Sequence, residues 1–391
     1  MKLERYNGLR RTKSFSRSTG RFSFSAKSIA FVILCRVALT HFQRLPNEDN
    51  VAQYGERLQE YLRDRHAMIT DTEKATHTSK MASWKAASRE VRVAFRDEEL
   101  AVRFTRLPRT LSPRCNARVI FLILSAAENF EQRTAIRATW AAAADSVAIQ
   151  RGDAKLFFMI GHDEAVRLKV DHEADRHGDL ILIDTLDTYA SLVYKSIAAL
   201  HVGTALCTSK LLVKADDDTV LHVDRIVAAS GTWMKTDEAV AYCAIHVNTR
   251  VERLETNKWF VSPSDFEHPI FPPYCYGPAY VLTKLAAIRI LEGTAEVALR
   301  LPEDALLTGV VALARDVRLH EPRGRFALHP YTVGYQIDER EARMAIASSD
   351  HKTPYEVRHT WNAMKSASIK MEEEEEGGER EGDYEETIKE K

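Results

Sequence analysis

Three consecutive carboxylates, Asp216, Asp217 and Asp218, directly follow the apolar run 211–213. Such a run predicts a buried parallel strand, and ligands of open α/β sheets bind beyond the carboxyl ends of these strands. Adjacent acids repel one another, so a divalent cation that bridges to a diphosphate would explain them, and Mg²⁺ or Mn²⁺ suits oxygen ligands. On the triplet alone, a solvated acidic turn that caps the following helix is an equally good explanation.

A second acidic pair, Glu303 and Asp304, comes directly after Pro302, where the pattern predicts a helix over 304–314. Proline is favoured at the first helical position, and carboxylates are favoured in the first turn. The helix dipole is therefore a sufficient structural reason for one of the two acids. The functional interpretation makes one of them a general base.

Basic residues occur where crossover helices begin. Arg133 and Arg137 are four residues apart, so they share one helix face, and two guanidinium groups there suit a phosphate-bearing ligand. Without further context, a solvated arginine pair is the better interpretation. Tyr189 and Lys195 follow the third predicted strand and are candidates to line a nucleotide pocket, although single residues of this kind are more often structural.

Aromatic residues and prolines concentrate in the segments 258–261 and 271–283. Adjacent prolines and clustered rings ahead of a short strand predict a stiff, apolar-faced loop, which would stack well against sugars. A loop that packs into the core is the alternative. The candidates for contact with an acceptor sugar are Trp259, Tyr274, Tyr276 and Gly277.

A regular alternation of strand-like and helix-like segments positions these residues. It predicts parallel strands joined by crossover helices, and therefore an α/β fold. The predicted strands cover 119–124, 156–160, 180–183 and 211–213, and the predicted helices between them cover 131–143, 163–177 and 189–202.

Length and charge restrict the class of protein. With 391 residues, one large catalytic domain with appendages is expected, and a net charge of −1 gives no general basic field for nucleic acid. No CxxC pair occurs, which argues against a thiolate zinc site. Cys115, Cys207, Cys243 and Cys275 are compatible with two disulfides and equally with four free thiols.

The N-terminal region is divided by its composition. Residues 1–27 predict a basic cytosolic tail, and 28–42 a short signal-anchor, although Arg36 interrupts this run and it is shorter than the ~20 residues that span a bilayer. A targeting helix or an ordinary amphipathic helix is the alternative. Residues 43–115 are expected to form a stem, 116–365 the catalytic domain and 366–391 a disordered acidic tail.

The order of the motifs carries more information than any one of them. The motifs are RTAIRATW at 133–140, DTLDTYASLVYK at 184–195, KADDDT at 214–219, the aromatic segment ending at 283, and PEDALLTG at 302–309. Over residues 119–361 this order closely resembles the β-1,3-glycosyltransferases of family 31, and the layout is similar to that of kinetoplastid members.

The resemblance implies a GT-A type nucleotide-sugar-binding fold with a mostly parallel central sheet flanked by helices. It also implies a UDP-galactose or UDP-N-acetylglucosamine donor, a glycan acceptor, Mn²⁺ or Mg²⁺, and inversion at the anomeric carbon. The protein would be a single-pass type II membrane protein of the Golgi or ER, with a luminal catalytic domain and no nucleic-acid partner. The oligomeric state stays open.

The resemblance also implies roles for individual residues. Asp216 corresponds to the residue that holds the UDP ribose and Asp218 to a metal ligand, within the motif that includes Lys214 and Asp217. Asp304 corresponds to the catalytic base, and Glu303 to its acidic neighbour.

A late histidine completes the implied metal site. His351, which precedes Trp361, resembles the family's metal-ligand histidine. The segment 277–279 departs from the usual glycine-rich turn, which leaves the geometry of the acceptor loop open.

The predicted function is therefore an inverting, metal-dependent hexosyltransferase that forms β-1,3 linkages on a glycan acceptor in protein or lipid glycosylation. One alternative is a catalytically silent, lectin-like or complex-assembly subunit of the secretory pathway. Another is a soluble cation-binding domain. The sequence leaves the donor sugar and the acceptor glycan open.

Overall fold

The computed structural model describes residues 89–111, 115–327 and 337–389, with side chains up to Met371. The basic segment 1–27 and the apolar run 28–42 lie outside the described residues. Within the described ranges, no helix carries an apolar stretch long enough to cross a bilayer.

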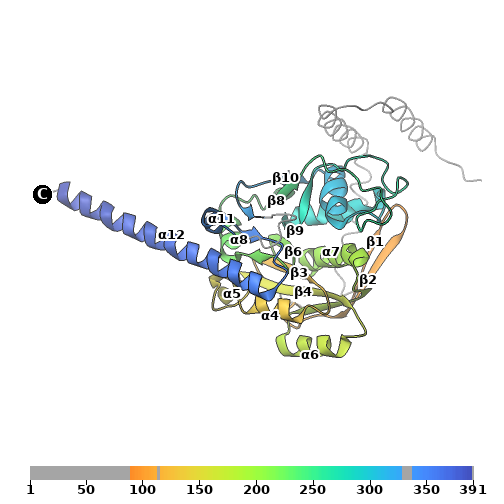
Figure 1. Cartoon of the computed structure of the whole chain (residues 1–391), viewed down its shortest axis with the longest axis horizontal. Coiled ribbons are helices and arrows are strands. Elements are labelled where there is room, and N and C mark those ends of the chain that lie inside the picture. Colours follow the sequence, from red (N-terminus) through yellow and green to blue (C-terminus); the bar gives the residue numbers. More distant parts are fainter. Residues whose placement is uncertain (1–88, 112–114, 328–336, 390–391) are drawn as a thin grey trace, which may run out of the picture. The chain divides into compact units, whose positions relative to one another are not determined.

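A nine-stranded sheet with the order β1-β2-β5-β4-β3-β6-β9-β8-β10 forms the centre of the fold (Figure 1). The four central strands β5, β4, β3 and β6 are parallel. Their bounds are Leu180–Leu186 for β5, Ala154–His162 for β4, Val119–Ser125 for β3 and Leu211–Asp216 for β6. The prediction of an α/β fold with a mostly parallel central sheet is confirmed.

The second half of the chain adds strands of mixed direction. β9 (Tyr274–Thr283) lies between β6 and β8 (Val240–His246) and is antiparallel to both, and β10 (Arg318–His320) pairs parallel with β8. The start of β9 therefore lies at the same sheet edge as the end of β6. A separate three-stranded sheet consists of β11 (Phe326–Ala327), β12 (Ala347–Ser348) and β7 (Val220–Leu221).

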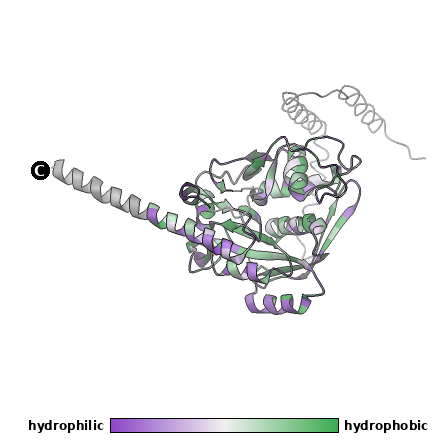
Figure 2. Ribbon diagram, in the orientation of Figure 1, coloured by the Kyte–Doolittle hydropathy of each residue, from purple (hydrophilic) through white to green (hydrophobic). Residues whose placement is uncertain are grey.

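Helices cover both faces of the central sheet, which explains why its strands are continuously apolar (Figure 2). On one face Ile120 and Leu122 belong to the core cluster that also contains α7, α9 and η4 residues. On the other, Phe121 and Ile123 belong to the cluster of α4, α5, α6, α8 and α12.

The helices of the first face are α7 (Leu192–His201), α9 (Lys284–Gly293) and the π-helical η4 (Ala305–Val311). Those of the second are α4 (Phe130–Arg137), α5 (Val147–Arg151), α6 (Arg167–His177), α8 (Val223–Ala229) and α12 (Pro354–Lys389). Shorter elements are η1 (Tyr189–Ser191), η2 (Val202–Leu206), η3 (Thr294–Glu296), α10 (Ala312–Ala314) and α11 (Glu339–Met344).

Two segments differ from the sequence-based expectation. β1 (Glu90–Ala94) and β2 (Glu99–Arg106) form a hairpin inside the predicted stem, and β2 pairs with β5. The folded domain therefore begins before the predicted boundary at 116, because alternating residues of both strands bury one apolar face. At the other end, α12 continues through the segment 366–389, for which the composition predicts disorder.

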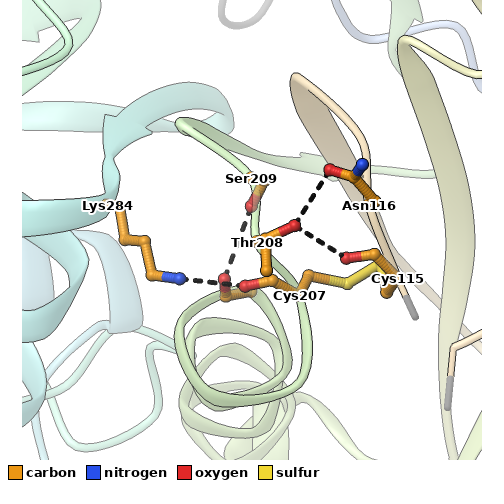
Figure 3. Close-up of a disulfide and its surroundings, with 7 residues drawn as sticks. Cys115, Asn116, Cys207, Thr208, Ser209 and Lys284 are labelled. Atoms are coloured by element: carbon orange, nitrogen blue, oxygen red, sulfur yellow. Dashed lines mark hydrogen bonds between the residues drawn. A yellow bond between two sulfur atoms is a disulfide. The ribbon is translucent and has the colours of Figure 1, made fainter. Parts of the chain in front are cut away.

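The four cysteines of the body form two disulfides, which resolves the alternative that the sequence left open. Cys115–Cys207 joins the segments that precede β3 and β6, and Cys243–Cys275 joins β8 to β9. Around the first disulfide, the Thr208 hydroxyl donates to the Cys115 carbonyl oxygen (Figure 3). Both disulfides thus fix strands whose ends carry the predicted site.

Candidate active site

Lys214 lies at the centre of a buried group of charged residues. Its Nζ atom donates to Asp216 Oδ1 at 2.9 Å and to the Gly277 carbonyl oxygen at 2.8 Å, and lies 3.5 Å from Glu303 Oε2. Only 3% of Lys214 is exposed. Burial lowers the pKa of Lys214, but the attraction of Asp216 and Glu303 outweighs it and the pKa is raised, so the side chain is charged. We call Lys214, Asp216, Glu303 and Asp304 the carboxylate cluster.

Glu303 and Asp304 occupy the turn where the π-helical η4 begins. Glu303 Oε1 accepts a hydrogen bond from the Tyr280 hydroxyl at 2.7 Å, and Asp304 Oδ1 accepts one from the Ala305 amide at 2.8 Å. Burial, followed by repulsion from Glu303, raises the pKa of Asp304 to about 6. A carboxyl group with such a pKa is suited to general base catalysis near neutral pH.

Gly277 provides the space that Asp304 occupies. A Cβ atom at position 277 would lie 3.0 Å from Asp304 Oδ2, so any other residue would push the carboxylate away. Glycine at this position therefore allows a close approach of the Asp304 side chain and is not needed for a left-handed conformation. This contact places the acceptor candidate Gly277 directly beside the base candidate.

The donor candidate Asp216 and the base candidate Asp304 both act on one side chain, Tyr189. Partial burial raises the pKa of the half-exposed Tyr189, and the negative charges of Asp304, Glu303 and Asp216 raise it further. Burial likewise raises the pKa of Asp216, to about 7, against the opposing attraction of Lys214. The end of β6, the start of η4 and η1 thus bring their predicted site residues into one place.

The predicted metal ligands are neighbours, but they do not form a complete ligand set. The His351 amide donates to the Asp218 carbonyl oxygen at 2.9 Å, and Lys352 pairs with the Asp218 carboxylate. The His351 ring nitrogens contact Ser348 Oγ at 3.0 Å and Thr360 Oγ1 at 3.4 Å.

The chemistry of these groups fits a divalent cation in part. Burial lowers the pKa of His351, so its ring is neutral as ligation requires, and Asp218 offers carboxylate oxygens. The His351 ring would have to give up one of its two hydroxyl contacts to bind a cation. Among the described residues, no group of three or more His, Cys, Asp or Glu side chains is arranged to hold a metal ion.

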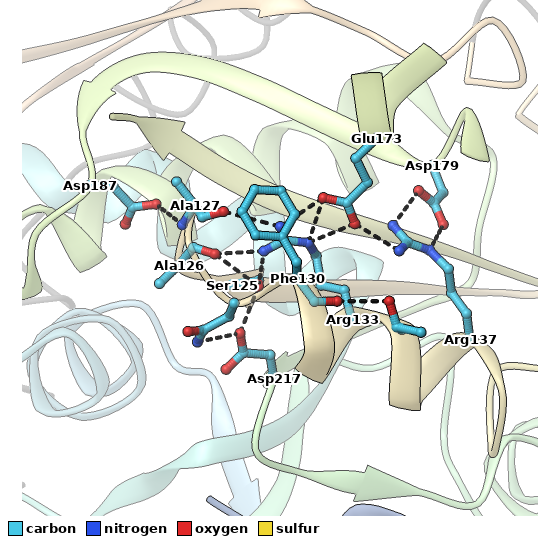
Figure 4. A network of polar contacts seen from close by, with 12 residues as sticks. Ser125, Ala126, Ala127, Phe130, Arg133, Arg137, Glu173, Asp179, Asp187 and Asp217 are labelled. Carbon is cyan, nitrogen blue, oxygen red and sulfur yellow. Dashed lines mark hydrogen bonds and ion pairs between the residues drawn. The ribbon is translucent and has the colours of Figure 1, made fainter. Parts of the chain in front are cut away.

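Arg133 and Arg137, the candidates for phosphate binding, have acidic partners inside the protein (Figure 4). Arg133 is fully buried, and its guanidinium nitrogens donate to Glu173, to Ser125 Oγ and to two backbone carbonyl oxygens of the loop after β3. Arg137 binds Glu173 and Asp179. These acidic partners lie some forty residues further along the chain, so the helix pattern alone could not reveal them.

Asp217 and Lys195 hold the loop after β3 from its other side. Asp217 Oδ2 accepts hydrogen bonds from Ser125 Oγ at 2.6 Å and Asn129 Nδ2 at 2.9 Å. Lys195 Nζ donates to the Ser125 carbonyl oxygen at 2.8 Å and pairs with Asp187. Both were predicted to contact a ligand, whereas the structure gives their side chains partners inside the protein.

We call Ser125, Asn129, Arg133, Lys195 and Asp217 the β3-end network. Sequence reasoning missed Ser125 and Asn129 because neither belongs to a recognisable motif.

The aromatic candidates separate into a surface group and a core group. Tyr189 is 51% exposed and Trp259 is 37% exposed, and Lys258 Nζ lies 5.4 Å and 4.4 Å from their ring centroids. These three residues form what we call the aromatic edge. Tyr274, in contrast, is buried beside His246, which supports the core-packing alternative for that residue.

Tyr276 is intermediate in exposure between the surface group and the core group. Its ring is partly buried and stacks on His246, with centroids 4.6 Å apart and planes 10° from parallel. The sequence analysis missed His246, Lys258 and Tyr280. Tyr280 carried a usable signal, because it belongs to the same apolar strand pattern as Tyr274 and Tyr276.

Comparison with known proteins identifies the family that the chain resembles. Residues 131–323 match the family described as Galactosyltransferase. The chain is 28% identical over 289 residues to β-1,3-galactosyltransferase bre-2 of Caenorhabditis elegans, which covers 70% of this chain and 77% of that protein. It is 28% identical over 175 residues to β-1,3-galactosyltransferase GALT1 of Arabidopsis thaliana, covering 45% of this chain and 27% of the plant protein.

Among solved structures, mouse xyloside xylosyltransferase 1 aligns with a TM-score of 0.30 and 10% identity, over 55% of this chain and 88% of that one. The sequence matches agree with the order of motifs that the chain itself displays. Residues 131–323 form a domain of the galactosyltransferase family, and the chain is a hexosyltransferase.

Proposed function

We propose that this hexosyltransferase is an inverting enzyme that moves a hexose or N-acetylhexosamine from a UDP-sugar to a glycan hydroxyl in β-1,3 linkage. The observation that carries the proposal is the position of Asp304, a partly buried carboxyl with a pKa of about 6 beside Gly277 and Tyr189. Asp304 lies near Asp216, the candidate for donor binding, so one residue can act on the acceptor while the other holds the donor.

In this mechanism Asp304 removes the proton from the acceptor hydroxyl as its oxygen attacks the anomeric carbon. The new bond forms between that oxygen and C1, and the bond from C1 to the diphosphate oxygen breaks, so UDP leaves with the electron pair. A single displacement turns an α-linked donor into a β-linked product. One general base is sufficient, in contrast to the two carboxyl groups of a glycoside hydrolase.

Other residues of the chain hold the reacting groups. We propose that Asp216 binds the ribose and that Trp259 and Tyr276 contact the acceptor sugar. Asp218 and His351 would hold Mn²⁺ or Mg²⁺, which would neutralise charge on the leaving diphosphate when bound. Positioning of two sugars against Asp304 would supply much of the remaining rate acceleration.

The proposed location is the Golgi or ER membrane, with residues 28–42 as a signal-anchor. The two disulfides of the folded domain support an oxidising compartment. The anchor segment itself lies outside the described residues.

The experiment is a donor panel on the purified full-length chain. UDP release is measured with UDP-galactose and UDP-N-acetylglucosamine, with glycan acceptors, and with and without Mn²⁺, and the product linkage is determined by NMR. The proposal expects acceptor-dependent UDP release and a β-1,3 product. Glycan binding without UDP release from any donor would favour the lectin-like alternative instead.

A further inference from the structure

The ammonium group of Lys214 contacts each of the three segments that build the carboxylate cluster. Asp216 is on the same strand, Gly277 is on β9 and Glu303 precedes η4. Lys214 and Tyr280 face each other directly on the paired strands β6 and β9, and the Tyr280 hydroxyl donates to Glu303. One buried side chain therefore joins the end of β6 to both of the segments that surround the base candidate.

Lys214 reaches Asp304 by two routes. The Gly277 carbonyl oxygen accepts from Lys214, and the Asp304 carboxylate lies in the space that a Cβ atom of residue 277 would face, 3.0 Å from its position. Glu303, the second partner, is the chain neighbour of Asp304 and is fixed from its other side by Tyr280. Since only 3% of Lys214 is exposed, it acts through these neighbours rather than on a substrate.

We propose that Lys214 is a positioning residue that fixes the carboxylate of Asp304 relative to Asp216 and thereby links the donor end of the site to the acceptor end. This role rests on the proposed function, in which Asp216 contacts the donor and Asp304 is the base. It differs from the predicted role of Lys214 as a ligand contact.

The charges around Asp304 predict the direction in which the pH–rate profile should move when Lys214 is replaced. The ionisable groups that face Asp304 are Glu303, Lys214, Tyr189 and Tyr280. Glu303 raises the pKa of Asp304 and Lys214 lowers it. Loss of the Glu303 charge should therefore move the acid limb of the pH–rate profile to lower pH, and the additional loss of Lys214 should move it back up.

The test compares Glu303→Gln with the double variant Lys214→Met/Glu303→Gln, both in the full-length chain. Lys214→Met alone would leave two buried carboxylates without their cation, and failure to fold would be uninformative. The double variant removes one positive and one negative charge, so the formal charge of the cluster is unchanged. The glutamine amide introduced at position 303 can still accept a hydrogen bond from Tyr280.

The double variant is expected to bind UDP within about threefold of the wild type while kcat falls about 100-fold, the size of effect that a displaced catalytic group produces. Calorimetry measures UDP binding, and UDP release over pH 5–8 measures kcat and the acid limb. Lys214→Arg keeps the charge but places a larger planar group, so it should bind UDP as the wild type does and still show a reduced kcat.

Arg225→Met is the matched control, since Arg225 is a partly buried cation that donates to carbonyl oxygens of Ala342 and Ala345 away from the cluster. It should lower the melting temperature and leave the acid limb in place.

Three results would overturn the role of Lys214: a double variant whose kcat stays near the wild-type value, an acid limb that is the same in Glu303→Gln and in the double variant, or an Arg225→Met variant that moves the acid limb equally. No sugar transfer by the wild-type chain would overturn the proposed function and this role with it. A double variant that transfers sugar with a kcat near the wild-type value overturns only the role of Lys214.

Discussion

The β3-end network and the aromatic edge are held in different ways. In the network, Arg133 and Lys195 are enclosed and donate to carboxylates and backbone carbonyl oxygens. At the aromatic edge, Tyr189 and Trp259 keep a third to a half of their surface exposed and are joined by contacts with Lys258. The β3-end network therefore supports the site as a rigid frame, whereas the aromatic edge has surface available for a substrate.

The largest effect is expected at Asp304, which belongs to neither region. Asp304→Asn should reduce kcat by about 10³-fold, because the variant cannot accept the proton of the acceptor hydroxyl. UDP affinity should stay near the wild-type value. Steady-state UDP release and UDP calorimetry on the same preparation measure both quantities, and retained transfer would contradict the assignment of the base.

The same variant should also show that the ionised form of Asp304 lowers the stability of the folded protein. The pKa of Asp304 is raised in the folded chain to about 6, so the stability that this residue contributes is present at low pH and is lost as pH rises through the window from 3.8 to about 6. At pH 8, the neutral amide of the asparagine avoids this cost. The melting temperature of Asp304→Asn should therefore equal or exceed that of the wild type.

Replacing Arg133 should destabilise the β3-end network. Arg133→Met should lower the free energy of unfolding by about 3–5 kcal/mol, because it leaves buried acceptors around the loop after β3 without a donor. Arg137→Met is the matched comparison and should cost about 1–3 kcal/mol, because Arg137 is partly exposed and donates to two carboxylates rather than to that loop. Urea unfolding monitored by circular dichroism measures both. Equal losses would show that the loop contacts of Arg133 add nothing.

A smaller effect is expected from pH. If Asp304 is the base, kcat/KM should rise with pH through about 6, since only the ionised carboxylate can accept a proton. At pH 5 roughly one tenth of the groups would be ionised, so the rate should be about a tenth of its value at pH 8. A profile that stays flat down to pH 5 would argue against a base with a raised pKa.

The smallest effect is expected at the aromatic edge. Trp259→Ala should raise the acceptor KM about 3- to 10-fold, the cost of losing one ring contact, and leave the donor KM in place. Leu254→Ala is the control, because Leu254 is an exposed apolar residue of the same β8–β9 connection, 62% exposed. Initial rates at varied acceptor concentration measure both variants. Equal effects would mean that the loop as a whole, rather than the ring, contacts the acceptor.

Much of this arrangement was accessible from the sequence. Buried apolar runs such as 119–125 predicted the parallel strands, and the resemblance identified Asp216 and Asp304, which the structure brings close together. The strand pair β1–β2 was missed although Leu100, Val102 and Phe104 alternate, because the surrounding charge suggested a stem. The role of each site residue stays a prediction.

What the sequence could not show is which charges neutralise one another. Arg133 and Arg137 carried a spacing that suited phosphate, but Glu173 and Asp179 satisfy them through contacts between α4, α6 and the start of β5. Asp217 shared a motif with Asp216 and yet turns toward Ser125. Such choices depend on distances across the fold, and local patterns do not contain them.

The connection between β8 and β9, residues 247–273, has its two ends held together by paired residues. His246 pairs with Tyr274, a bridge joins Arg250 to Ile270, and the Cys243–Cys275 disulfide lies just inside them. Insertions or deletions between Arg250 and Ile270 should therefore leave β8 and β9, the strand that carries Gly277, in register. The segment can therefore diverge as an exchangeable module. If Trp259 contacts the acceptor as proposed, grafting the segment between relatives should transfer acceptor preference onto an unaltered catalytic core.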